Sequence, residues 1–132
     1  MASRRSWFTG IAGALLTLLL IPVGWFVGLL TWASKCDGDG GEPFSARASA
    51  AGRFCSSPVA TPYLMVEWML PVVVMAVGTV LAVRRASPAR IGIALAGAVG
   101  LLIVMYGCVE SLPSYCTDEQ REHGRAYDCE TY

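Results

Sequence analysis

The sequence predicts an all-α integral membrane protein with three transmembrane helices, and two observations carry this prediction. The chain is 55% hydrophobic, with a mean hydropathy of +0.52, and its apolar residues are gathered in three long blocks. Charged residues make up 15% of the chain, below the roughly 25% of an ordinary soluble domain. We therefore expect one three-helix membrane domain over residues 1–132.

The distribution of charge predicts how the chain crosses the membrane. Arg4 and Arg5 precede the first block, and Arg84, Arg85 and Arg90 lie between the second and third, with no acidic residue in either segment. Cytoplasmic loops are enriched in Lys and Arg, so we expect the N-terminus in the cytoplasm and the C-terminus outside. The net charge of zero gives no basic field for nucleic acid.

The first block, residues 7–32, is long enough to cross a bilayer, since about 20 apolar residues suffice. Trp7 and Trp32 mark its ends, where indole rings favour the headgroup region. A secretory signal peptide is the alternative, because residues 3–8 resemble a twin-arginine export signal. The apolar stretch is too long for that, and Lys35 before Cys36 does not suit a lipoprotein cleavage site, so we expect a retained helix.

The second block, residues 62–83, begins with Thr61 as a predicted cap and Pro62 in the first turn. The third block, residues 91–112, follows a short turn at Ser87-Pro88, so the two spans form an antiparallel hairpin. This arrangement leaves an exoplasmic loop over residues 34–60 and a short exoplasmic tail over residues 113–132.

Small residues recur at helical spacing on two spans, as Gly24 and Gly28 on the first and as Gly92, Ala96 and Gly100 on the third. Such faces let helix backbones approach closely in lipid. We expect them to pack the three helices against one another. The alternative is that one face packs against another protein.

Four of the five cysteines fall in the exoplasmic segments, where disulfides persist. We expect local pairs, Cys36 with Cys55 and Cys116 with Cys129; cross-links between loop and tail are the alternative. Cys108 is left over, near the outer end of the third span. We expect it to be a small buried apolar residue rather than a lipid-attachment site or a reactive thiol.

Glu67 is the one acidic residue well inside a span, about five positions into the second, and an ionisable group there suggests a functional site. Pro71 cannot donate to the carbonyl of residue 67, which leaves an unpaired acceptor beside the carboxyl group. An ion or proton site is therefore one interpretation. The simpler one is that Glu67 reaches the interface or pairs with a basic residue: Lys35, Arg47 or Arg53.

Motifs for catalysis or cofactor binding are missing from the sequence. No two cysteines have the C-x-x-C spacing of redox enzymes. His123 is the only histidine, and the acidic run from Asp37 to Glu42 lacks the spacing of an EF-hand. Neither a G-x-S-x-G motif nor a phosphate-binding loop occurs. We expect no enzyme activity, cofactor or metal.

The remaining hypothesis is a non-catalytic accessory or assembly subunit of a larger membrane complex, whose partners are the lipid bilayer and other membrane subunits. The alternative is a small homo-oligomeric transporter or channel that uses Glu67. A third is an enzyme or redox partner that uses the exoplasmic cysteines. A single Lys and the absence of Asn fit a GC-rich genome, so we expect a bacterial cytoplasmic membrane.

Overall fold

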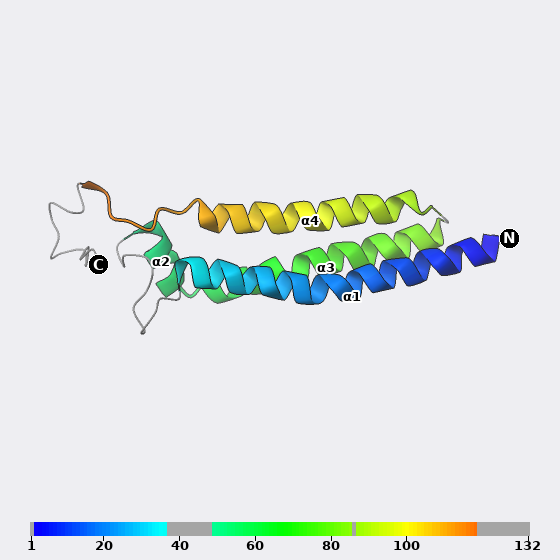
Figure 1. Ribbon diagram of the computed structural model, residues 1–132, viewed down its shortest axis with the longest axis horizontal. Helices are drawn as coiled ribbons and strands as arrows, with labels where there is room; N and C mark the ends of the chain where they lie inside the picture. Colours follow the sequence, from blue (N-terminus) through cyan, green and yellow to red (C-terminus); the bar gives the residue numbers. More distant parts are fainter. Residues whose placement is uncertain (1, 37–48, 86, 119–132) are drawn as a thin grey trace.

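The computed structural model describes residues 2–36, 49–85 and 87–118, and these parts of the chain are helical with short connections. The helices are α1 (Ala2–Lys35), α2 (Ala50–Ser56), α3 (Ala60–Arg84) and α4 (Ala89–Glu110). The long helices α1, α3 and α4 run along one another, while α2 lies across one end (Figure 1). We call this end, formed by Lys35, α2 and Glu110, the capped end.

Three helices are long and apolar enough to cross a membrane: Ser6–Lys35, Ala60–Arg84 and Ala89–Glu110. The shortest has 22 residues, which rise about 33 Å at 1.5 Å per residue, close to the roughly 30 Å of a hydrocarbon core. Large apolar side chains cover their outer surfaces, such as Phe8, Phe26 and Ile103. This outward apolar surface is typical of helices that face lipid.

The three predicted spans are confirmed as helices, but their ends differ from the sequence prediction. Thr61 is not the cap of α3, because the helix already begins at Ala60 and Val59 at the cap position makes no side-chain hydrogen bond. Pro62 still lies in the first turn, where its missing N–H leaves no helical bond unmade. The last span, predicted to reach residue 112, ends at Glu110.

The segment 34–60 contains a helix, α2, which the sequence did not predict because seven residues are too few to show a periodicity. Ser49 caps it by accepting a hydrogen bond from the Gly52 N–H at 3.0 Å. The predicted disulfide between Cys36 and Cys55 is confirmed, with the two Cα atoms 5.4 Å apart. This bond joins the end of α1 to α2 and holds α2 over the bundle.

The second predicted disulfide falls partly outside the described residues. Cys116 is disulfide-bonded, which agrees with its predicted role, but Cys129 lies outside the described part of the chain. The pairing of Cys116 with Cys129 therefore stays a prediction. The cross-linked alternative for Cys36 and Cys55 is wrong, since these two cysteines pair with each other.

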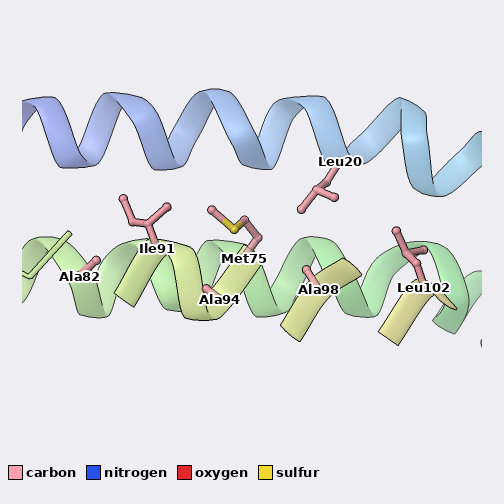
Figure 2. Close-up of a cluster of buried hydrophobic side chains, with 7 residues drawn as sticks. All are labelled: Leu20, Met75, Ala82, Ile91, Ala94, Ala98 and Leu102. Carbon is pink, nitrogen blue, oxygen red and sulfur yellow. The ribbon is translucent and has the colours of Figure 1, made fainter. Parts of the chain in front are cut away.

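The centre of the bundle is a cluster of buried apolar side chains from all three long helices. Figure 2 shows Leu20 of α1 pointing toward α3 and α4. The other members are Met75, Ala82, Ile91, Ala94, Ala98 and Leu102. Alanines form nearly half of the cluster, so the helices meet over short side chains and their backbones lie close together.

Buried positions recur every 11 residues along each long helix. They include Thr9, Leu20 and Thr31 in α1; Ala60, Pro71 and Ala82 in α3; and Ile91 and Leu102 in α4. Eleven residues make close to three turns of an α-helix. Each helix therefore turns one nearly straight stripe toward the other two.

Close packing occurs at glycines that the sequence analysis did not single out. A Cβ atom on Gly13 would collide with Thr79 of α3, and one on Gly78 would collide with the Ala94 side chain of α4. Of the predicted packing residues, Gly24 does contact α3, since a Cβ there would lie 3.1 Å from the Trp68 ring. These glycines let α3 approach both of its neighbours.

The predicted packing face of α4 does not pack within the bundle. Gly92 and Ala96 are exposed, and a Cβ atom on Gly92 or Gly100 would meet no atom within 4 Å. The same holds for Gly28 of α1. The expectation of internal packing is therefore wrong for this face of α4. The helix is rotated so that Ala94 and Ala98 face inward instead.

Gly78→Leu should destabilise the bundle by about 1–3 kcal/mol, the usual effect of overpacking a close contact. The measurement is reversible unfolding by SDS in mixed micelles, followed by circular dichroism. Gly107→Leu is the matched control, because a Cβ atom there meets no neighbour within 4 Å. Equal stability of the two variants would contradict the close contact between Gly78 and Ala94.

Candidate functional site

Polar contacts between the helices gather toward the capped end. The Lys35 ammonium lies 3.4 Å from the Glu110 carboxylate and donates to the Ser114 hydroxyl at 3.3 Å, which joins α1 to the end of α4. The Tyr63 hydroxyl donates to the Met105 carbonyl at 2.8 Å, which joins α3 to α4. Together these contacts fix the ends of the three helices at one level.

The short helix α2 adds two further contacts at this end. The rings of Phe54 and Tyr63 meet edge to face, with centroids 5.5 Å apart, a favoured aromatic geometry. The Ala51 N–H donates to the Pro113 carbonyl at 3.2 Å. Along with the disulfide, they place α2 against both α3 and the segment that follows α4.

Glu67 lies inside this network and is completely buried, with 0% of its surface exposed. One carboxyl oxygen, Oε1, lies 3.0 Å from the hydroxyl of Thr31, which is also buried. The other oxygen, Oε2, is buried and has no hydrogen-bond partner. A buried polar atom without a partner is unfavourable by about 1–3 kcal/mol, so Glu67 is the least satisfied group among the described side chains.

The Thr31 hydroxyl serves two acceptors with a single proton. It lies 3.0 Å from the Val27 carbonyl as well as 3.0 Å from Glu67 Oε1, and a hydroxyl has one O–H to donate. If Glu67 is ionised, Thr31 donates to it. If Glu67 is protonated, Glu67 donates to Thr31 and Thr31 donates to the Val27 carbonyl, so the contact survives in either state.

The simpler interpretation of Glu67 from the sequence includes a pair with a basic residue, and no such pair is observed within the described residues. Glu67 is buried inside the bundle, and its depth relative to the membrane interface stays a prediction. Lys35 pairs with Glu110 instead, and Arg53 is exposed on α2. Arg47, the third predicted partner, lies outside the described residues. The observed partner, Thr31, was not predicted.

A groove of about 280 Å³ opens along the α1–α3 seam beside this contact. Three tryptophans line it, and Gly28 leaves open space where a side chain would stand. The lining includes Trp25, Gly28, Trp32, Thr61, Leu64 and Trp68. The Trp68 ring is held in place because its N–H donates to the Ile21 carbonyl at 3.1 Å, so one wall of the groove has a fixed orientation.

The residues that line the groove and the two residues of the buried Thr31–Glu67 contact belong to the same turns of α1 and α3. Gly28 and Trp32 lie on either side of Thr31 in α1, and Leu64 and Trp68 lie on either side of Glu67 in α3. Thr31 and Glu67 do not line the groove themselves, but they lie on the helix turns that carry its walls. Sequence reasoning found Glu67 but not the groove, because its two walls lie far apart along the chain.

Other candidate residues do not join this site. Cys108 is a free cysteine and is exposed, so the expectation that it is buried is wrong; it lies on the outward side of α4. Within residues 2–36, 49–85 and 87–118, no three His, Cys, Asp or Glu side chains come close enough to hold a metal ion. His123 lies outside the described residues.

Comparison with known proteins gives no relative. No protein-family model matches the chain, and no curated protein or solved structure matches it.

Thr31→Val should destabilise the bundle by about 1–3 kcal/mol, because it removes the hydrogen-bond partner of Glu67 and leaves both carboxyl oxygens buried and unpaired. SDS unfolding in mixed micelles measures the change. Thr17→Val is the matched control, since the Thr17 hydroxyl bonds to the carbonyl of Gly13 in its own helix at 2.8 Å.

The double variant Thr31→Val/Glu67→Met provides an internal test of this contact. Replacing both partners by apolar groups of similar size removes the unpaired carboxyl group, so most of the lost stability should return. If the stability lost in the double variant equals the sum of the losses in Thr31→Val and Glu67→Met alone, a direct contact between Thr31 and Glu67 is contradicted.

Proposed function

We propose that the chain is a multi-pass protein of a bacterial cytoplasmic membrane and a non-catalytic accessory or assembly subunit of a larger membrane complex. The observation that carries this proposal is the outward face of α4. Gly92 and Ala96 are exposed there, and Gly92 and Gly100 have open space where a side chain would stand. Helices associate in lipid through such small-residue faces.

The composition of this face supports a helical partner rather than lipid alone. The side chains of Ile93, Ile103 and Val104 on the same helix are also exposed, so small and large apolar residues alternate on this surface. Packing of ridges into grooves is how helices contact one another. A partner helix that lies over Ala96 would bring its backbone close to that of α4.

The alternative, a homo-oligomeric transporter or channel with Glu67 at its centre, receives less support from the geometry. Glu67 lies inside its own bundle, in contact with α1, rather than on a surface that a second copy would meet. An assembled pore would need polar groups that face outward from the spans. The outward surfaces of the described spans are instead covered mainly by apolar side chains.

Ala96→Leu should weaken association with the partner by about tenfold or more, equivalent to about 1.4 kcal/mol, because a large side chain separates the two backbones. The measurement is mass spectrometry of the protein extracted from its native membrane with a mild detergent, with the stoichiometry of co-extracted subunits. Ala14→Leu is the matched control, since Ala14 is an exposed alanine of α1.

Two outcomes would contradict the accessory role. In one, the wild-type protein is extracted without any stoichiometric partner. In the other, Ala96→Leu and Ala14→Leu retain the partner equally. A homo-oligomer with no other subunit would support the transporter alternative instead.

The proposed orientation, with the N-terminus inside and the C-terminus outside, rests on three arginines around the α3–α4 turn. They are Arg84 at the end of α3, Arg85 just after it and Arg90 in the first turn of α4. A C-terminal fusion to alkaline phosphatase, which folds only outside the cytoplasm, should be active. A C-terminal fusion to green fluorescent protein at the same position should be dark when exported through the general secretory route. The reverse result would show that the topology is inverted.

A further inference from the structure

We propose that the groove between α1 and α3 is a binding site for a free organic cation with apolar substituents, held by the indole rings of Trp25, Trp32 and Trp68 and by the negative charge of Glu67 on the same helix turns. This inference does not depend on the accessory role, which concerns the opposite, outward face of α4. It rests on the shape and composition of the groove and on the state of the carboxyl group beside it.

The walls of the groove suit a cation with an apolar surface. Indole is the strongest of the aromatic rings for attracting cations to its face, and three of the four tryptophans of the chain line this groove. The remaining lining is almost wholly apolar, with Thr61 at one edge. A hydrated metal ion would find too few oxygen ligands here, whereas an alkylated ammonium group would not need them.

Glu67 supplies the complementary charge. Its Oε2 atom is completely buried and has no partner, and no ion pair involves Glu67 within the described residues. An ionised carboxylate in such a place needs a counter-charge. Lys35, the basic side chain near this level, is already paired with Glu110. Burial without a counter-charge favours the neutral acid, so a cation in the groove would stabilise the ionised form of Glu67.

The buried contact and the groove lie on the same turns of α1 and α3. Thr31 and Glu67 contact each other at 3.0 Å, and each is the direct chain neighbour of a groove tryptophan, Trp32 or Trp68. Attraction between opposite charges is stronger in the protein interior than in water. Glu67 therefore attracts a cation in the groove without lining the groove itself.

Gly28 provides the space for a ligand. Gly28 lines the groove, and a Cβ atom there would meet no atom within 4 Å. A larger side chain at this position should fill the groove without disturbing the packing of α1 on α3. This makes Gly28 the position at which occupancy can be tested separately from charge.

The probe is benzyltrimethylammonium, which combines one aromatic ring with a permanent positive charge. Binding is measured by isothermal titration calorimetry with the full chain in maltoside micelles, which contain no ammonium groups, and empty micelles give the background. We expect saturable binding of one probe per chain. The uncharged carbon isostere neopentylbenzene has the same shape and should bind the wild-type protein about tenfold or more weakly.

Three variants separate charge from space. Glu67→Gln removes the charge and should weaken binding of the probe by about tenfold or more. Gly28→Leu should abolish binding by filling the groove. Gly92→Leu is its matched control, because this glycine also has open space around it but lies on α4, and it should bind as the wild type does.

The proposal is overturned if the wild-type protein binds benzyltrimethylammonium no better than empty micelles do. It is also overturned if neopentylbenzene binds as tightly, since the groove would then be a simple apolar site for lipid chains. Circular dichroism checks that each variant is folded. Because the comparison of the two probes uses the wild-type protein, it decides the role of charge even if Glu67→Gln does not fold.

Discussion

Close approach of helix backbones is the constraint on which the rest of this structure depends. Helices surrounded by lipid gain little from hiding apolar side chains, because the lipid tails are equally apolar, so association relies on packing contacts and a few interhelical hydrogen bonds. The chain meets this constraint with Gly13 against Thr79 and with Gly78 against Ala94. The central position of α3, which contacts both α1 and α4 in this way, makes it the organising helix of the bundle.

The two ends of the bundle are held by different forces. Near the turn between α3 and α4, the contacts are close and apolar, with Ala82, Ile91 and Ala94 in the buried cluster. Toward the capped end they are polar or covalent, and include the Lys35–Glu110 ion pair and the Cys36–Cys55 disulfide. Glu67 belongs to the polar end, where a hydrogen-bond partner from α1 is within reach. The buried carboxyl group thus lies where the helices are already fixed by other contacts.

The two proposed interaction surfaces lie on different helices and differ in chemistry. The α4 face offers exposed small residues, which suit another helix. The groove between α1 and α3 is lined by tryptophans and shares its helix turns with a buried carboxyl group, and we propose that it takes a small cation. The two surfaces can therefore act independently, and a protein anchored to a partner through α4 would keep the groove open on its other side.

Hydropathy and local spacing alone predicted the three spans and the presence of an acidic residue, Glu67, inside one of them, since each is legible within a short stretch of chain. They favoured the Cys36–Cys55 disulfide over cross-linked pairs, and the structure decided it. Only the tertiary structure decided how each helix is rotated about its axis. A span that is apolar on every side carries no amphipathic pattern to orient it. The sequence therefore predicts the wrong inward face for α4 and a buried Cys108, whereas Ala94 and Ala98 face inward and Cys108 is exposed. The contact of Thr31 with Glu67 joins residues 36 positions apart, and the groove joins two such helices. These features depend on the rotation of two helices at once, which the sequence of either one does not specify.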